Sequence, residues 1–278
     1  MSVPPAKSQS RKEEPAKDDG KSAEENKMSD TVSRFSNRVA NYVKYRPGYP
    51  PEVLDLFKNE MGLTLDSVVA DIGSGTGLST KPFLANGNKV YGVEPNAAMR
   101  AAAEEYLKDF PNFISHDGTA ENTNLPDASV DFVIAAQAFH WFDAEKTGAE
   151  FQRILRPEGY VVLIWNERQL DSTEFLREYE KLLMKFGNDY EKVRHENIDQ
   201  EQLGDFFKAG YERAKFSNEQ VLDYEGLRGR LLSSSYMPAE DSSKYPALEK
   251  ELKTLFAKHS EHGKIKVFYD TNIYYKQY

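Results

Sequence analysis

The stretch VVADIGSGTGLST, residues 68–80, decides the fold. An apolar run ending at Ile72 is followed by glycines at 73, 75 and 77, which is typical of a buried strand that turns into a helix around a nucleotide. The dinucleotide-binding pattern G-x-G-x-x-G requires a glycine at position 78, where this chain has Leu78. The phosphate-binding pattern G-x-x-x-x-G-K-[ST] is also absent. Asp71, at the end of the strand, would repel a pyrophosphate and favours a ligand with a cationic amine.

The composition limits the classes of protein to which the chain can belong. It has 278 residues, of which 39% are hydrophobic and 12% aromatic, enough for one large domain with its own core. There is no cysteine, which excludes disulfides, thiolate metal ligands and a cysteine nucleophile. The five histidines form no recognisable ligand pattern, so no metal site is predicted. The net charge of -9 disfavours a nucleic-acid surface, because phosphate contacts need clustered Lys and Arg.

The distribution of apolar residues argues against membranes and secretion. No apolar run approaches the roughly 18 residues that indicate a membrane span, and the N-terminus lacks an apolar stretch of the secretory kind. We therefore expect a cytoplasmic protein, a monomer or homodimer, whose partner is a small molecule. Residues 1–30 are rich in Lys, Glu, Asp, Ser and Pro and are predicted to form a disordered tail.

The remaining residues, 31–278, are predicted to form one α/β domain. Short apolar runs alternate with amphipathic helical stretches, which is typical of a parallel sheet with helices on both faces. Strands are predicted at 68–72, 89–93, 113–115, 132–136, 160–165, around 213–218 and at 264–275. Helices are predicted at 52–61, 78–86, 96–108, 143–155, 171–187 and 224–232. Pro82 lies inside the second of these helices and predicts a local kink.

The pattern Asp71-x-Gly73-x-Gly75-x-Gly77 resembles motif I of the class I S-adenosylmethionine-dependent methyltransferases. Other segments of that family follow in order. They are Val93-Glu94-Pro95 after the second strand, Asp117–Glu121 after the third, Leu125–Asp131 before the fourth and Arg153–Gly159 before the fifth. Ordered motifs at this spacing are far more specific than a lone glycine loop.

This resemblance implies a Rossmann-like, seven-stranded sheet and a helical cap formed by about residues 31–63 and 171–260. It implies that the cofactor is S-adenosyl-L-methionine and that Glu94 binds its ribose hydroxyls. The cofactor-binding residues that it implies are Asp71, Gly73, Ser74, Gly75, Gly77, Glu94, Thr119, Ala120, Glu121 and Gln137.

A narrower similarity is carried by Tyr45-Arg46-Pro47, Val93–Asn96 and Gln137–Phe142. These segments resemble the trans-aconitate methyltransferase-like subgroup, which acts on small molecules. The similarity implies methyl transfer to an oxygen, either of a carboxylate or of a hydroxyl. The substrate-binding residues are then expected to be Tyr42, Tyr45, Arg46, Trp141 and Asn166, with Arg46 suited to a bidentate pair with a carboxylate.

His140 is the candidate catalytic residue. A histidine can take the proton from a hydroxyl or a carboxylic acid nucleophile. The alternative is a structural histidine packed on Trp141, and an ionised carboxylate acceptor would need no base. Two other functions stay open at this point, namely a protein or RNA methyltransferase and a non-catalytic protein that binds S-adenosylmethionine.

Overall fold

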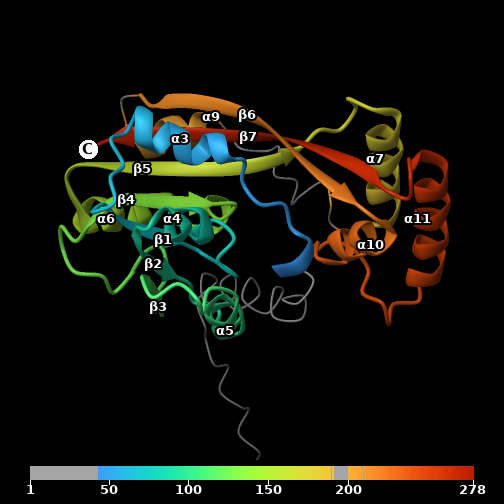
Figure 1. Cartoon of the computed structure of the whole chain (residues 1–278), viewed down its shortest axis with the longest axis horizontal. Coiled ribbons are helices and arrows are strands. Elements are labelled where there is room, and N and C mark those ends of the chain that lie inside the picture. The colour runs from blue at the N-terminus through green and yellow to red at the C-terminus, as the bar shows by residue number, and fades with distance from the viewer. Residues whose placement is uncertain (1–42, 189, 191–199, 209) are drawn as a thin grey trace, which may run out of the picture.

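A seven-stranded sheet forms the centre of the molecule (Figure 1). The computed structural model describes residues 43–188, 190, 200–208 and 210–278, so the predicted tail at 1–30 lies outside the described part. The strands are β1 (Val68–Ile72), β2 (Lys89–Val93), β3 (Phe113–His116), β4 (Val130–Ala136), β5 (Leu155–Arg168), β6 (Glu212–Leu222) and β7 (Ile265–Gln277). Their order in the sheet is β3-β2-β1-β4-β5-β7-β6. The predicted α/β class and Rossmann-like sheet are confirmed.

The order of the strands defines where a ligand can bind. Strands β1 to β5 run parallel, and β7 pairs antiparallel with both β5 and β6. The chain order reverses beside β1, whose Asp71 pairs with Gly92 of β2 and Ile134 of β4. Ligands of open α/β sheets bind outside the carboxyl ends of the strands at such a reversal. The fold therefore gathers the glycine loop and the ends of β2 and β4 around one site.

Helices cover both faces of the sheet (Figure 1). They are α3 (Pro51–Asn59), α4 (Thr80–Asn86), α5 (Ala97–Tyr106), α6 (Ala144–Ile154), α7 (Glu174–Phe186), α9 (Gln200–Phe207), α10 (Tyr224–Leu232) and α11 (Tyr245–His259), with a short 3-10 helix, η1 (Phe139–Trp141). None of the helices that the structure describes is long and apolar enough to cross a membrane.

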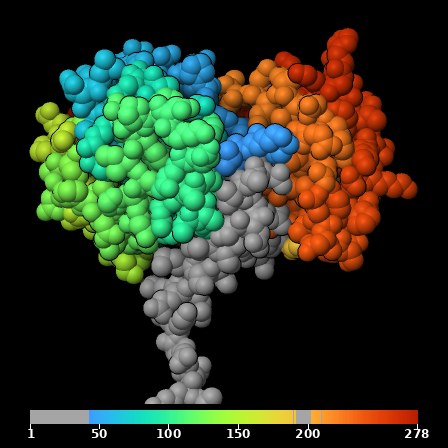
Figure 2. Space-filling model, turned by 60° about the horizontal axis from the view of Figure 1, so that its bottom comes forward, coloured from blue at the N-terminus to red at the C-terminus, as the bar shows by residue number. Residues whose placement is uncertain are grey.

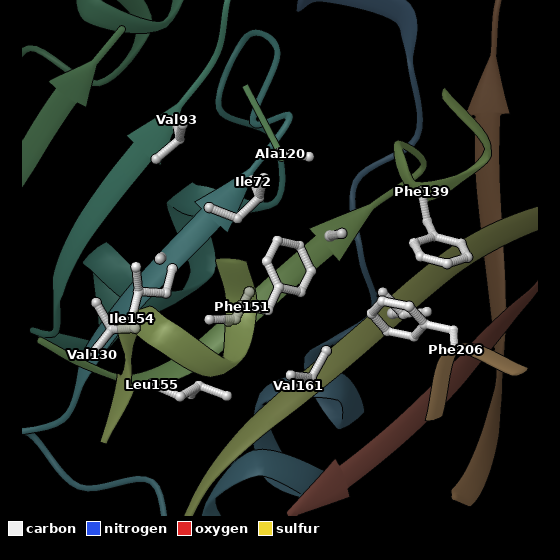
Figure 3. Close-up of a cluster of buried hydrophobic side chains, with 14 of the residues drawn as sticks. Ile72, Val93, Ala120, Val130, Phe139, Phe151, Ile154, Leu155, Val161 and Phe206 are labelled. Atoms are coloured by element: carbon white, nitrogen blue, oxygen red, sulfur yellow. The ribbon is translucent and has the colours of Figure 1, made fainter. Parts of the chain in front are cut away.

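Alternate residues of β1 face opposite layers, as the two-residue period of a strand requires. Val69 belongs to a buried cluster with α3 and α4, whereas Ala70 and Ile72 belong to a cluster with α6 and α9. Figure 3 shows the second cluster, in which Phe151 of α6 and Phe206 of α9 lie against the sheet. Both faces of β1 are thus held rigidly, and so is the loop that follows it.

The cap is smaller than predicted. It consists of α7, α10 and α11, which lie together at one side of the sheet (Figure 1). Their apolar side chains share a buried cluster with the beginning of β7. Helices α3 and α9 pack on the sheet instead, and β6 is one of its strands. The predicted cap boundaries of 31–63 and 171–260 therefore include segments that belong to the sheet and its layers.

Two local predictions also need correction. The helix predicted at 78–86 begins at Thr80, so Pro82 lies in its first turn. A proline there removes no helical hydrogen bond, and the reason for a kink disappears. Helices α9 and α11 were absent from the predicted series. In α11 the buried Leu248, Leu252 and Leu255 recur at helical spacing, which is the signal that could have found it.

Candidate cofactor and substrate site

The glycine loop turns sharply after β1. The backbone N–H groups of Gly73 and Ser74 both donate to the carbonyl of Val93, at 2.8 and 3.2 Å, which ties the loop to the end of β2. Gly73, Gly75 and Gly77 all have positive φ, at 68°, 56° and 84°. Such values strain any residue that has a Cβ atom.

The three glycines differ in what surrounds them. A Cβ atom at Gly73 would lie 2.7 Å from Cβ of Ala138, and one at Gly77 would lie 2.5 Å from Cδ1 of Leu107. A Cβ atom at Gly75 would meet no atom of the described residues within 4 Å. Gly73 and Gly77 thus allow close packing inside the protein. Gly75 keeps a space open in front of the loop, where a ligand can approach the backbone.

We expect Gly77→Ala to reduce the free energy of unfolding by about 2–4 kcal/mol, because the overlap with Leu107 adds to the backbone strain. Gly75→Ala adds backbone strain without a side-chain overlap, so it should reduce the free energy of unfolding by only about 1–2 kcal/mol. Urea denaturation of the two variants measures the difference. Equal losses would contradict the packing role of Gly77.

Asp71 is completely buried at the end of β1. Its Oδ2 accepts hydrogen bonds from the hydroxyls of Ser79, at 2.6 Å, and Thr80, at 2.7 Å, at the start of α4. Its Oδ1 is buried and has no hydrogen-bond partner among the described residues. Burial raises the pKa of Asp71 to about 6, against the opposite effect of the two hydroxyls. One oxygen therefore holds the helix start in place, and the other is available to a donor.

Glu94 follows β2 and faces the loop. Its Oε2 accepts from the N–H of Gly75, at 3.0 Å, and its Oε1 from the N–H of Asn96, at 2.9 Å. Burial raises its pKa, although these two backbone bonds act to lower it. Each carboxylate oxygen has a second lone pair, so the group can still accept from a pair of hydroxyls. Arg100, which the sequence interpretation missed, donates to the Glu94 carbonyl at 2.6 Å and to Asp117 at 2.9 Å.

The segment after β3 lies at the next strand end. The N–H of Thr119 donates to the Asn122 carbonyl at 3.0 Å, and its hydroxyl accepts from the Asn122 N–H at 3.1 Å. Ala120 is buried, and Oε1 of Glu121 accepts from the N–H of Asp143 at 3.0 Å. In the described part of the chain these residues shape the loop and join it to the start of α6.

Gln137, at the end of β4, has a φ of 59°, which is unusual for a residue with a side chain. Its Nε2 donates to the carbonyl of Asn166 at 3.0 Å, while its Oε1 is buried without a partner among the described residues. Backbone strain of this kind is often stored at functional sites. It lets the chain turn into η1, where Ala138 lies against Gly73.

His140 lies in η1 with its ring centre 4.8 Å from that of Trp141. Its side chain is exposed, yet protein surrounds much of the ring. This desolvation lowers the pKa of His140 to about 4. The lowered pKa keeps the imidazole neutral at neutral pH.

A segment that we call the strap, Tyr45–Gly48, runs between the sheet and the cap. Figure 2 shows it in blue, between the green half of the molecule and the orange and red cap. The Tyr45 carbonyl accepts a hydrogen bond from Nε2 of Gln220 at 3.1 Å. The Tyr45 ring lies against Gly229 of α10. Arg46 donates to the Ser233 carbonyl at 3.1 Å. Tyr42, also predicted to bind substrate, lies outside the described residues.

Asn166 fixes the other end of the strap. Its Nδ2 donates to the Gly48 carbonyl at 3.0 Å. Its Oδ1 accepts from the hydroxyl of Thr271, at 2.6 Å, and from Nδ2 of Asn218, at 3.2 Å. The predicted substrate ligand is therefore bonded to its own chain through both side-chain atoms. It positions the strap beside Gln137.

The chemistry of the gathered groups fits S-adenosylmethionine. The cofactor presents an ammonium group and two ribose hydroxyls as donors. The site offers the free Oδ1 of Asp71, the carboxylate of Glu94 and the free Oε1 of Gln137 as acceptors. The space in front of Gly75 admits a ligand to the backbone. The residues present thus match the polar groups of the cofactor.

Comparison with known proteins agrees with this geometry. Residues 70–163 match the family model of a methyltransferase domain. The chain is 35% identical to an uncharacterized methyltransferase of Mycobacterium tuberculosis over 58% of this chain and 61% of the relative. It is 33% identical to an uncharacterized methyltransferase-like protein of Schizosaccharomyces pombe over 57% of this chain and 60% of the relative. The alignments thus span about three fifths of the length of these curated relatives.

Solved structures share the fold. A protein of Anaeromyxobacter dehalogenans described as a type II methyltransferase superposes with a TM-score of 0.63 and 20% identity, over 84% of this chain and 98% of that one. A protein of Anabaena variabilis assigned to antibiotic biosynthesis as a methyltransferase superposes with a TM-score of 0.55 and 24% identity, over 83% and 98%. Residues 70–163 thus match a methyltransferase domain, and the similarity in sequence and in fold supports a class I S-adenosylmethionine-dependent methyltransferase.

Proposed function

We propose that the protein transfers a methyl group from S-adenosylmethionine to an oxygen of a small molecule, a carboxylate or a hydroxyl. The observation that carries the proposal is the pair of buried carboxylates, Asp71 and Glu94, at adjacent strand ends around the open face of Gly75. The strap and the cap stand over this edge of the sheet, and they favour a small acceptor over a macromolecule.

The chain's own residues would bind and orient the reactants. Glu94 would accept from the ribose hydroxyls, and Oδ1 of Asp71 would accept from the ammonium group. The cofactor supplies an electrophilic methyl group on a sulfonium. Positioning the acceptor oxygen in line with that methyl group accounts for most of the rate, because no acid or metal is needed to activate the leaving group.

His140 would serve only one of the two acceptor classes. A hydroxyl must lose its proton as the new bond forms, and a neutral imidazole at the end of β4 is the form that can accept it. A carboxylate is already ionised at neutral pH and needs no base. His140→Asn should therefore slow methylation of a hydroxyl strongly and that of a carboxylate only weakly.

The test is incubation of the purified protein with methyl-labelled S-adenosylmethionine and a metabolite extract enriched in small carboxylic and hydroxy acids. Small molecules are then separated from protein and RNA. Label in a small product supports the proposal, and its mass identifies the acceptor. Label confined to protein or RNA would overturn the substrate class. Binding of the cofactor without any labelled product would favour a non-catalytic role.

We expect the affinity for S-adenosylmethionine to rise about tenfold as the pH passes upward through about 6, because Asp71 then ionises and can accept from the ammonium group. The ligand-free protein should respond in the opposite sense. The folded-state pKa of Asp71 lies above the unfolded value of about 3.9. The free energy of unfolding of the ligand-free protein should therefore fall as the pH rises from about 4 to about 6.

Isothermal titration calorimetry between about pH 5 and pH 8 measures the affinity, with Asp71→Asn as the control. Asparagine cannot ionise, so its curve should be flat through this range. A wild-type curve that is flat as well would show that Asp71 does not contact the ammonium group.

A further inference from the structure

Strand β6 forms one edge of the sheet (Figure 1). Its register with β7 is continuous from Glu212 to Leu222, and it contains no proline. Among the described residues only β7 pairs with it, so its other side presents backbone groups that have no partner strand. The opposite edge of the sheet, β3, has four residues, whereas β6 has eleven. A long and regular edge of this kind is able to pair with another strand.

The hydrogen bonds of β7 show which residues of β6 face outward. The N–H of Gln169 donates to the carbonyl of Phe268 at 2.9 Å, so the even-numbered residues of β7 direct their backbone groups toward β5. The odd-numbered residues of β7 therefore face β6, where Tyr269 is paired with Asn218. The same alternation turns the backbone groups of the odd-numbered residues of β6 away from the sheet. These residues are Arg213, Lys215, Ser217, Glu219 and Val221.

The side chains of β6 point to two faces with different surroundings. The even-numbered side chains contact the rest of the chain. Phe216 packs on the buried cluster that contains Phe57 of α3, and Asn218 donates to the Gly48 carbonyl at 2.9 Å. The five odd-numbered side chains are all exposed. Their residues thus combine outward backbone groups with side chains that a partner can reach.

The exposed face of β6 carries charges in matched positions. Nζ of Lys215 lies 2.8 Å from Oδ2 of Asp270, and Nζ of Lys266 lies 3.2 Å from Oε2 of Glu219. Both ion pairs join β6 to β7, and Ser217 lies midway between Lys215 and Glu219. A cation and an anion therefore flank the centre of the strand at equal distances along the chain.

We propose that two copies of the chain associate by antiparallel pairing of their β6 strands about a two-fold axis at Ser217. In this register Lys215 lies opposite Glu219 of the second copy, and Arg213 lies opposite its Val221. An axis at any other residue would leave at least one of the outward residues without a partner among the five. The proposal concerns the assembly of the protein and does not depend on the methyl-transfer reaction.

The charges favour this register, and they favour a second copy as the partner. Cross-strand pairs of opposite charge stabilise a sheet, whereas like charges directly opposite destabilise it. The axis at Ser217 creates the pair of Lys215 with Glu219 twice. Each pair extends into a row of alternating sign, in which Asp270 and Lys215 of one copy are followed by Glu219 and Lys266 of the other. An axis at Lys215 would place that residue opposite itself, and a strand of unrelated sequence would lack the complementary charges.

Cysteine cross-linking tests the register directly, because the chain has no cysteine of its own. In Ser217→Cys the two thiols meet at the axis, where the Cα atoms of an opposed pair are about 5.5 Å apart, within the range that a disulfide spans. Val221→Cys is the matched control on the same exposed face. Its two copies lie roughly 27 Å apart along the paired strands. Mild oxidation should therefore give a covalent dimer of Ser217→Cys and none of Val221→Cys.

Sedimentation velocity at micromolar concentrations measures the association itself. The wild type should sediment as a dimer. Lys215→Glu and Glu219→Lys each place like charges opposite one another, so each should weaken the dimer about tenfold or more. An equimolar mixture of the two variants should restore it, because every introduced charge then faces its opposite. Lys185→Glu makes the same change at an exposed lysine of the cap and should leave the dimer unchanged.

Three results would overturn the assignment. They are a wild type that sediments as a monomer, a dimer that the two charge variants leave intact or that their mixture does not restore, and a disulfide at Val221 instead of Ser217. Circular dichroism should show that each variant keeps its secondary structure, so a lost dimer reports on the edge strand. None of these measurements uses the cofactor or an acceptor, so a failure of the proposed function would leave their outcome unchanged.

Discussion

Replacing Glu94 by alanine should weaken the binding of S-adenosylmethionine by at least about a hundredfold, because two hydrogen bonds to a charged acceptor are lost, each worth about 1.5–3 kcal/mol. The same change removes the acceptor of the Gly75 and Asn96 N–H groups, so the loop itself loses a support. The affinity of Glu94→Gln for S-adenosylmethionine should lie between that of the wild type and that of Glu94→Ala. Its amide keeps one acceptor oxygen and puts donors where the second oxygen stood.

Calorimetric titration of the cofactor measures these affinities. Asp117→Asn is the matched control, since this carboxylate also follows a strand and contacts Arg100 but is 73% exposed. Asp117→Asn should change the affinity for S-adenosylmethionine by less than about threefold. Circular dichroism of Glu94→Ala should show an unchanged secondary structure. A folded Glu94→Ala protein that binds the cofactor like the wild type would mean that the ribose site lies elsewhere.

The second large effect concerns stability. Arg168→Met should reduce the free energy of unfolding by about 3–5 kcal/mol, because it removes the cation of a buried ion pair. Arg168 contacts Glu180 and, at 3.0 Å, the hydroxyl of Tyr190, which in turn donates to Glu180 at 2.7 Å. The two charged side chains are 9% and 12% exposed. Methionine fills a similar volume, so the loss is electrostatic rather than a cavity.

Guanidinium chloride denaturation measures the loss. The double variant Arg168→Met/Glu180→Leu should recover much of it, since the remaining charge has gone too. Lys185→Met is the control, because it breaks an exposed ion pair of the cap, that of Lys185 with Glu251. It should reduce the free energy of unfolding by less than about 1 kcal/mol. A single Arg168→Met variant as stable as this control would show that the pair contributes nothing.

Much of the fold could be predicted because its signals are local. Short apolar runs between helical stretches predicted most of the seven strands, and alternating side chains predicted the last of them. The extent of the cap could not be predicted in the same way. Helix α3 has one buried face whether it packs on the sheet or on the cap, and only the folded chain shows that Phe57 meets the sheet.

The candidate site likewise has a part that local sequence predicts and a part that it does not. Asp71 lies at the end of one predicted strand and Glu94 directly follows the next, so their meeting around the loop was foreseeable. The bonds that position the strap join residues far apart in sequence, as in the contact of Asn166 with Gly48.

The place of β7 between β5 and β6 also orders events during synthesis of the chain. Strand β5 leaves the ribosome well before β7, and β6 cannot join the sheet without it. Until then, β5 presents an open row of backbone donors and acceptors, of the kind that pairs with other chains. A nascent chain that stalls before Ile265 would therefore be a target for chaperones or a seed for aggregation.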